Sequence, residues 1–570
     1  MATKRLAPPA GPALFLELLH GALARDGYLS PGATREIAEA LEASPADVYS
    51  AATFYHYVRT EPGHALPAGI CEGPVCRLIS PQADRALRQR LGIGVDGRSA
   101  DGRYRYQGVP CPGLCDRAPA LFFDGRFYGG GDVAPAWPPV EAPASLPEAT
   151  GEGAISPLLE SERAYEILMG ALRSLTPERL IAVVLDSGLL GRGGAGFPAG
   201  RKWDAVRAAP AGTKYVVCNA DEGEPGTFKD RPVLELGPEL LIAGMALAGY
   251  AVGASAGIIY LRYEYHRALD TLRAAIERAE ARGVLGDDVG GKGFAFRVYV
   301  RRGAGAYVCG EETSLLNSLE GKRPWPRDRP PFPTTHGLFG APTLVNNVET
   351  LAAVPAIVER GADWFRSLGR GESAGTKLYS VSGRVRRPGA YELPLGVTAR
   401  ELILERAGGI VEGRTLKAFT LGGVSGGLLP ATAAGLPLDY DSPLGEGAFL
   451  GSGGIVVLHE GDCVVRFARD CLRFFESESC GKCYPCRIGT VRLRELLDEA
   501  TGGTERSLPG EEAAARYHEL SEAMRIGSAC GLGPSAALLV SSLFLHFRGE
   551  VEEHVLHGRC PAGVCGRSDG

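Results

Sequence analysis

The chain has 570 residues and a formal net charge of −6, with 45% apolar and 22% charged side chains, as in a globular protein of several domains. This negative charge argues against nucleic-acid binding. No apolar run reaches the roughly 18 residues that span a bilayer, and residues 1–10 lack the pattern of a signal peptide. We therefore expect a cytoplasmic protein whose 14 cysteines stay reduced and serve mainly as metal ligands.

The N-terminal third predicts helices followed by short strands. Residues 11–60 carry apolar side chains at helical spacing. Residues 65–130 predict strands and cysteine loops, with a tight hairpin turn at 123–127. The segment 136–156, rich in Pro, Ala, Glu and Gly, predicts a semi-extended linker after a first domain, 1–135.

Three further regions follow the linker. Residues 157–370 alternate strand-like segments, at 215–218, 257–261 and 296–300, with amphipathic helical segments such as 264–281, which indicates an α/β domain. Residues 371–460 are rich in glycine and in strand patterns, and residues 461–570 are helical again. In this last region helices are predicted at 464–476, 488–499, 512–526 and 535–548.

The first cysteine group contains two pairs of thiols. Its members are Cys71, Cys76, Cys111 and Cys115. Four thiolates in two pairs suit a [2Fe–2S] cluster or a zinc ion. The spacing favours iron–sulfur and leaves zinc as the alternative.

The second group has three cysteines within seven residues and a distant fourth. Its members are Cys480, Cys483, Cys486 and Cys530. This spacing suits three corners of a [4Fe–4S] cube, with the fourth ligand from elsewhere in the chain. The run leads into a predicted helix, whose N-terminus favours an anionic cluster. A zinc site with one spare cysteine is the alternative.

Six cysteines remain. Four stand in apolar surroundings and are interpreted as small core residues: Cys218, Cys309, Cys463 and Cys471. Cys560 and Cys565 resemble the opening of a ferredoxin-type cluster loop without two further ligands. We interpret them as a remnant or a redox-active pair with no metal of their own.

Three loops in the α/β region combine glycines with charged residues. The loop 188–203 contains Arg192 and Lys202, and it matches neither a Walker loop nor clearly a Rossmann fingerprint. The loops 218–226 and 303–313 place acids beside glycines after strand-like segments. Their carboxylates can accept hydrogen bonds from ribose or ribityl hydroxyls. Any one loop is equally typical of a solvated turn, but together they predict a ligand site.

Five motifs in order resemble the NADH-oxidising flavoprotein subunit of respiratory complex I. They lie at 191–198, 219–226, 310–313, 345–350 and 479–487. The N-terminal cysteines resemble those of its small [2Fe–2S] partner subunit, here fused to it. The resemblance implies a multidomain α/β protein with a thioredoxin-like [2Fe–2S] domain, a Rossmann-like α/β FMN and NAD domain, a β-grasp-like segment and a C-terminal helical bundle with a [4Fe–4S] cluster.

The resemblance also implies the cofactors and their residues. The expected cofactors are FMN, NAD(H), one [2Fe–2S] cluster and one [4Fe–4S] cluster. FMN would contact Gly191, Arg192, Gly193, Lys202, Asn219, Asp221, Glu222, Gly310, Glu311, Glu312, Asn346 and Asn347. Gly194 is a further cofactor-binding candidate. NAD(H) would contact Phe197, Lys202, Glu224, Tyr307, Glu312 and Phe332, with Lys202, Glu224 and Glu312 as the catalytic candidates.

Two positions depart from the family pattern. Position 223 is Gly where relatives often have Ser, and position 329 is Arg where relatives often have Lys. The first removes a possible hydrogen bond to the flavin, and the second replaces a point charge with a forked one. Glu222 and Glu224 would repel a ribose 2′-phosphate, so we expect a preference for NAD(H) over NADP(H).

The implied activity is that of a diaphorase, passing hydride between nicotinamide C4 and flavin N5 and single electrons through the Cys480 cluster. The fused architecture most resembles the β subunit of an NAD-dependent molybdenum or tungsten formate dehydrogenase. Its partner would be a catalytic α subunit with a molybdenum or tungsten pterin and further iron–sulfur clusters. The alternatives are the diaphorase subunit of an NAD-reducing hydrogenase or of complex I, and, from another class, a colourless zinc-stabilised scaffold.

Overall fold

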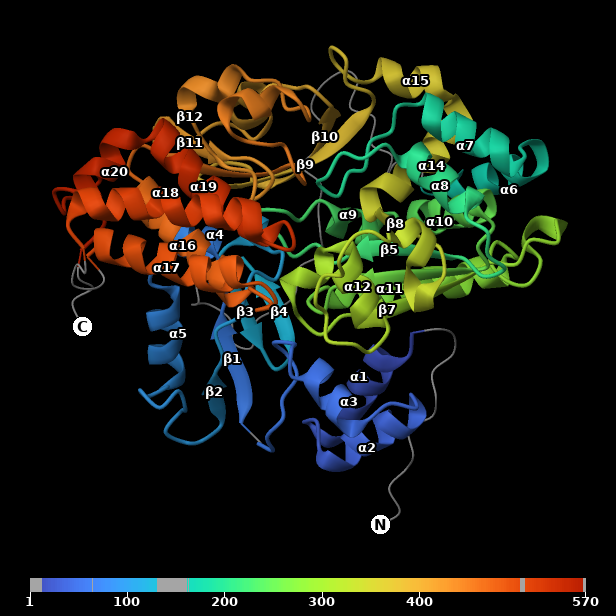
Figure 1. Cartoon of the computed structure of the whole chain (residues 1–570), viewed down its shortest axis with the longest axis horizontal. Helices are drawn as coiled ribbons and strands as arrows, with labels where there is room; N and C mark the ends of the chain where they lie inside the picture. Colours follow the sequence, from blue (N-terminus) through green and yellow to red (C-terminus); the bar gives the residue numbers. More distant parts are fainter. Residues whose placement is uncertain (1–12, 64, 131–160, 162, 503–507, 567–570) are drawn as a thin grey trace.

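The computed structural model describes residues 13–63, 65–130, 161, 163–502 and 508–566 (Figure 1). Within these ranges the chain forms three β-sheets and a group of C-terminal helices. The predicted linker 136–156 lies outside the described residues.

The central sheet is parallel, with the strand order β7-β6-β5-β8. Its strands are β5 (Tyr215–Ala220), β6 (Ala256–Leu261), β7 (Arg297–Arg302) and β8 (Thr343–Asn347). The register pairs Asn219 of β5 with Asn347 of β8, so the loops that follow both strands begin side by side. Carboxyl ends of parallel strands are the usual position of a ligand site in α/β proteins.

One face of this sheet carries most of the helices of the α/β domain. They are α6 (Ala164–Ser174), α7 (Pro177–Asp186), α8 (Ala199–Ala208), α9 (Asp230–Leu236), α10 (Pro238–Val252), α11 (His266–Ala281), α14 (Val348–Arg360) and α15 (Ala362–Ser367). A short helix, α13 (Pro333–His336), contacts β8. Of the helices in the described ranges, none is individually long and apolar enough to cross a membrane; α9 and α10 meet that measure only as a pair bent by 100°.

The opposite face is covered by the N-terminal helices, which confirms helices within 11–60. These are α1 (Phe15–Asp26), α2 (Pro31–Ala40) and α3 (Pro45–Ala52), joined by α12 (Glu312–Leu319). Phe15 and Leu19 share an apolar cluster with Ile258 of the central sheet. The N-terminal helices therefore complete the core of the α/β domain, and Figure 1 shows them beneath it.

The second sheet belongs to the thioredoxin-like part and has the order β2-β1-β3-β4. Its elements are β1 (Leu66–Ile70), α4 (Pro74–Ile79), α5 (Ala83–Leu91), β2 (Tyr104–Tyr106), β3 (Ala120–Phe123) and β4 (Arg126–Gly129). Asp124 and Gly125 join β3 to β4 with φ of 48° and 75°. Positive φ at both positions is typical of a two-residue hairpin turn, so the tight turn predicted at 123–127 is confirmed.

The third sheet has the order β10-β9-β13-β11-β12. Its strands are β9 (Thr376–Gly383), β10 (Gly389–Pro394), β11 (Leu416–Thr420), β12 (Leu428–Pro430) and β13 (Gly454–His459). The helices that follow are α16 (Val464–Ser477), α17 (Tyr484–Ala500), α18 (Gly510–Gly527), α19 (Leu532–His546) and α20 (Arg548–Val555). Helix α17 begins four residues before its predicted start, which places Cys486 in its first turn.

Candidate functional site

A cavity of about 310 Å³ lies where the carboxyl ends of β5 and β8 face the third sheet and the start of α19. Ten of the seventeen predicted FMN and NAD(H) residues line it. They are Gly193, Gly194, Asn219, Asp221, Glu222, Glu224, Tyr307, Gly310, Glu311 and Asn347. The three glycine and acidic loops, far apart in the sequence, thus meet at one cavity.

The glycine-rich loop brings bare backbone to the cavity wall. Gly194 has φ of 135°, in the region that side chains rarely adopt. A Cβ added at Gly193 would stand 3.1 Å from Cβ of Asn347. Glycine therefore lets the loop pass close to β8, and Gly193 and Gly194 line the cavity with backbone atoms alone.

Asp221 offers a free acceptor inside the cavity. Asn219 fixes the loop, because its Oδ1 accepts from the backbone N–H of Asp221 at 3.1 Å and its Nδ2 donates to the carbonyl of Gly310 at 2.8 Å. Oδ2 of Asp221 is buried without a hydrogen-bond partner among the described residues. Burial raises the pKa of Asp221 well above its usual range, with Arg262 opposing the shift. A ligand hydroxyl at this position would satisfy the carboxyl group.

Glu224 is held by the third sheet. Its Oε1 accepts from the backbone N–H groups of Val424 and Ser425 at 2.8 and 3.0 Å. Its Oε2 accepts from the hydroxyls of Ser425 and Tyr307, both at 2.6 Å. Burial raises the pKa of Glu224 to about 7 against the effect of these hydrogen bonds. The carboxyl group is therefore fixed at the cavity wall and titrates near neutral pH.

Glu222 is also committed to internal contacts. It accepts from the backbone N–H of Asp230 at 2.9 Å and from the Tyr265 hydroxyl at 2.8 Å. Burial, followed by the Asp230 carboxylate, raises the pKa of Glu222 to about 7. One carboxylate oxygen of Glu222 thus accepts from the start of α9, and the other accepts from the residue just before α11.

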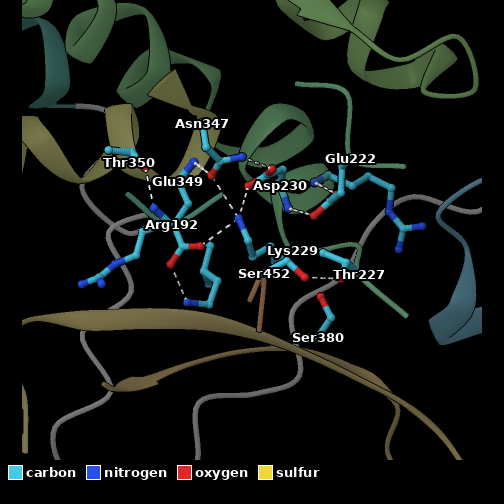
Figure 2. Close-up of polar contacts among 12 residues, drawn as sticks. Arg192, Glu222, Thr227, Lys229, Asp230, Asn347, Glu349, Thr350, Ser380 and Ser452 are labelled. Carbon is cyan, nitrogen blue, oxygen red and sulfur yellow. Dashed lines mark hydrogen bonds and ion pairs between the residues drawn. The ribbon is translucent and has the colours of Figure 1, made fainter. Parts of the chain in front are cut away.

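A buried cation that the sequence patterns did not indicate also lines the cavity. Figure 2 shows Lys229 at the centre of a polar network. Its ammonium group lies 2.7 Å from Asp230, 2.9 Å from Glu349 and 3.1 Å from Oδ1 of Asn347. Burial alone would lower the pKa of Lys229, but the carboxylates of Asp230 and Glu349 raise it overall. Lys229 therefore stays charged and places a positive charge in this wall of the cavity.

Arg192 is placed differently from its predicted role. Its guanidinium group is buried and donates to the carbonyl of Ala374 at 3.0 Å, while its backbone N–H donates to the Thr350 hydroxyl at 2.9 Å. In Figure 2 its side chain points away from Lys229. The residue fixes the glycine-rich loop, and its charge lies outside the cavity lining.

Lys202 and Glu312 form a pair beside the cavity. The ammonium group of Lys202 lies 2.7 Å from Glu312 and 3.0 Å from the carbonyl of Val345. Arg329 pairs with both Glu311 and Glu312. The forked cation at position 329 is thus held by carboxylates next to the cavity.

The remaining predicted residues also lie outside the lining. Phe197 and Phe332 are 54% and 53% exposed, so their rings are accessible to a stacking partner. Asn346 is buried and accepts from the indole N–H of Trp203 at 3.0 Å. Gly191 donates its backbone N–H to the carbonyl of Phe197 at 2.8 Å, which closes the glycine-rich loop.

The second cysteine group gathers around the starts of α17 and α19. Cys483 immediately precedes α17, and Cys486 lies within its first turn. The backbone N–H of Ala529 donates to the Cys483 sulfur at 3.5 Å, which brings the Cys530 loop to this group. Burial raises the pKa of Cys530 to about 11. Cys530 also lines the cavity, so the thiol cluster and the cavity share a wall.

The first cysteine group is buried in the thioredoxin-like part. The sulfurs of Cys111 and Cys115 lie 3.3 Å apart, and the backbone N–H of Ala120 donates to the Cys76 sulfur at 3.4 Å. The backbone N–H of Gly226 donates to the Cys115 sulfur at 3.3 Å. Gly226 closes the acidic loop of the cavity, so both sites contact the same short segment.

The residues present fit the implied groups. The free oxygen of Asp221 suits a ribityl hydroxyl, and the glycine-lined wall suits a close-lying ring. Four cysteines at each of two places provide the donor sets of iron–sulfur clusters.

Comparisons with known families match four consecutive parts of the chain. The thioredoxin-like [2Fe-2S] ferredoxin family matches residues 7–135, and the Nuo51 FMN-binding domain matches residues 184–356. The SLBB domain matches residues 378–428, and the NADH-ubiquinone oxidoreductase-F iron-sulfur binding region matches residues 466–554. These matches confirm the predicted multidomain fold and the FMN, [2Fe–2S] and [4Fe–4S] cofactors.

Curated relatives come from several kinds of complex. An NADH-quinone oxidoreductase subunit of Rhizobium meliloti is 45% identical over 413 residues, 72% of this chain and 96% of the relative. The NADP-reducing hydrogenase subunit HndC of Solidesulfovibrio fructosivorans is 45% identical over 404 residues, 71% of this chain and 81% of the relative. The alpha subunit of the NAD-reducing hydrogenase HoxS of Cupriavidus necator is 36% identical over 503 residues, 84% of this chain and 82% of the relative.

A solved structure is similar over nearly the whole chain. It is a chain in a crystal structure of an NAD+-reducing [NiFe]-hydrogenase in the H2-reduced state. The TM-score is 0.84 at 36% identity, and the match covers 97% of this chain and 93% of the other.

Proposed function

Because the chain belongs to the family of NADH-dehydrogenase-type flavoprotein subunits that carry FMN and iron–sulfur clusters, we propose that it exchanges electrons between NAD(H) and a partner subunit in the cytoplasm. FMN, when bound, supplies the conversion between the two-electron hydride of NADH and the single electrons that iron–sulfur clusters carry.

The protein's own residues hold the reacting groups in place. Asp221 would accept from a ribityl hydroxyl, and the backbone at Gly193 and Gly194 would lie against the flavin. The exposed rings of Phe197 and Phe332 would stack on the nucleotide.

The observation that carries the proposal is the position of Cys530. This cysteine belongs to the predicted [4Fe–4S] set and lines the cavity together with Asn219, Asp221 and Glu224. A cluster ligand at the cavity wall gives electrons a short path out of the flavin site. A zinc-stabilised scaffold would not require a cysteine of its metal site to line a ligand cavity.

For the partner, we propose the catalytic subunit of a molybdenum or tungsten formate dehydrogenase. The support is the resemblance of the architecture, in which the thioredoxin-like and flavoprotein parts form one chain. The alpha subunit of HoxS matches this chain over 84% of its length. The diaphorase subunit of an NAD-reducing hydrogenase is therefore the second candidate.

The first experiment is an anaerobic absorption spectrum before and after addition of NADH, with iron and sulfide assays on the same sample. We expect flavin and iron–sulfur absorbance, about six irons per chain from the two cluster types, and bleaching by NADH. Addition of NAD+ to a matched sample is the control and should leave the spectrum unbleached. A colourless sample that contains zinc and no iron would overturn the proposal in favour of the scaffold.

The partner is identified separately. The chain is purified from its source with its associated subunits, and NAD+ reduction is measured with formate and with hydrogen. Formate-dependent reduction is the expected result. Hydrogen-dependent reduction without formate activity would replace formate dehydrogenase with the second candidate and leave the diaphorase proposal intact.

A further inference from the structure

The C-terminal tail folds back onto the start of α16. The loop after α20 is closed by a hydrogen bond from the backbone N–H of Gly563 to the carbonyl of Cys560, at 3.0 Å. Arg466, in the first turn of α16, donates to the carbonyl of Val564 at 2.7 Å. The fold thereby brings together residues separated by about 90 to 100 positions.

Four ligand-type side chains meet at this contact: Cys463, His554, Cys560 and Cys565. One ligand atom from each lies within 4.8 Å of the others. The Cys463 sulfur is 3.3 Å from Nε2 of His554 and 3.5 Å from the Cys565 sulfur. A tetrahedral zinc ion with bonds of about 2.3 Å to sulfur and about 2.0–2.1 Å to nitrogen separates its ligands by roughly 3.5–3.8 Å. The observed spacing is close to that of a zinc site.

The surroundings prepare these side chains for a cation. Nδ1 of His554 donates to the carbonyl of Glu550 at 2.7 Å, which leaves Nε2 as the lone-pair nitrogen beside Cys463. Cys463 precedes α16, and its sulfur accepts from the backbone N–H of Arg466 at 3.3 Å. This hydrogen bond fixes the sulfur at the N-terminus of the helix, where the helix dipole favours the negative charge of a metal-bound thiolate.

Excess negative charge at the site would be balanced by a neighbouring arginine. Three thiolates and a neutral imidazole around Zn²⁺ carry a net charge of −1. Cys565 lines a second cavity together with Arg77, Arg466, Arg469 and Arg473. Arg77, Arg469 and Arg473 pair with Glu72, Asp470 and Asp498. We therefore assign the charge balance to Arg466, whose guanidinium group donates to the carbonyl of Val564 beside Cys565.

We propose that Cys463, His554, Cys560 and Cys565 bind a structural zinc ion that fixes the C-terminal tail to the start of α16. Four protein ligands close the coordination sphere, as in structural zinc sites. The site is separate from the predicted [4Fe–4S] cluster, because the two lie at opposite ends of α16. Cys463 precedes the helix and Cys480 follows it, and its 14 residues span about 21 Å at roughly 1.5 Å per residue. The proposal replaces our sequence-based interpretation of Cys463 as a plain core residue and of Cys560 and Cys565 as a pair without a metal.

Metal analysis of the full chain tests the proposal. The protein is produced with zinc and iron in the medium, purified anaerobically without a C-terminal tag, and assayed for zinc, iron and FMN. We expect about one zinc per chain besides the cluster iron. Zinc K-edge absorption should show three sulfur ligands at about 2.3 Å and one nitrogen at about 2.0–2.1 Å.

Ligand variants give the second readout. Cys565→Ser and His554→Ala should lower zinc at least fivefold while iron and FMN stay within about 20% of wild type. His557→Ala, an exposed neighbour of the site, is the matched control and should keep its zinc.

Three results would overturn the proposal. The first is wild-type protein with full iron and no zinc, and the second is zinc retained in both ligand variants. The third is a disulfide between Cys463 and another of these cysteines, found by mass spectrometry of the anaerobic protein. The wild-type zinc content and absorption spectrum decide the matter even where a variant folds poorly.

Discussion

Replacement of Lys229 by Met should expose the cost of an uncompensated buried charge. Methionine keeps the length and apolar character of the side chain and removes the ammonium group. Asp230 and Glu349, both buried, would then lose a cation at 2.7 and 2.9 Å. Removing one partner of a buried ion pair costs about 3–5 kcal/mol.

The lower end of this range is expected here. Asp230 keeps a hydrogen bond of 2.6 Å from Nδ2 of Asn347, and Glu349 keeps Lys377 at 3.7 Å. A loss of about 3 kcal/mol in a domain of roughly 200 residues corresponds to a fall in Tm of about 6–12 °C. Because Lys229 lines the cavity, the variant should also bind less FMN.

The pH dependence of this loss distinguishes charge from packing. Burial opposes ionisation of Glu349, but the charges of Lys229, Lys377 and Arg192 hold its pKa below the usual range in the wild type, so this pKa rises when Lys229 is replaced. As the pH falls, the folded variant then binds more protons than the folded wild type, so its stability relative to wild type improves. The deficit in Tm should be smaller at pH 5.5 than at pH 7.5.

The assay is thermal unfolding of wild type and variant at both pH values, followed by intrinsic fluorescence and flavin release. Lys214→Met is the matched control. The ammonium group of Lys214 is also buried, but it donates to the carbonyls of Val206 and Arg207. Its Tm deficit should not shrink at the lower pH. A Lys229→Met protein with unchanged Tm, or with the same deficit at both pH values, would refute the reasoning.

Three further variants test the site. Gly226→Ala should lower Tm and the [2Fe–2S] signal, because φ at Gly226 is 88° and the new Cβ would stand 2.6 Å from Val456. The clash alone should cost about 1–3 kcal/mol. Gly212→Ala, whose Cβ would have no atom within 4 Å, is the control, and equal effects of the two variants would contradict this account. Cys483→Ala should leave the bleaching of the flavin by NADH within about twofold of wild type but abolish electron delivery to the partner. If both the bleaching and the electron delivery were lost, the cluster would have a structural role. Glu224→Gln should lower the ratio of kcat/KM for NADH over NADPH about tenfold, or ~1.4 kcal/mol, whereas an unchanged ratio would place the ribose elsewhere.

Local patterns predicted most of the secondary structure. The strands at 215–218, 257–261 and 296–300 lie within or overlap β5, β6 and β7, because short apolar runs between turn residues leave few alternatives. The predicted start of α17 is four residues too late. The reason is that the cysteine loop and the first helical turn overlap, so no break in pattern separates them.

The sequence indicated the loops of the site better than its interior. The glycine and acidic loops were found because three of them occur in one domain, although each alone is equally typical of a solvated turn. Lys229 was missed because its partner Glu349 lies 120 positions away, and nothing local marks a lysine for burial. For the same reason the sequence could not associate Cys463 with His554, whose proximity depends on how the C-terminal helices pack.

The packing of α1–α3 on the central sheet has a consequence for how the molecule behaves on dilution. Phe15 and Leu19 reach the same apolar cluster as Ile258, and all belong to one chain. Association of the N-terminal part with the central sheet is therefore intramolecular and independent of protein concentration. Two separate chains would need tight binding to stay together at the nanomolar concentrations of a kinetic assay. In this molecule the turnover per chain should remain constant across such dilutions, because the N-terminal part cannot diffuse away from the flavin site.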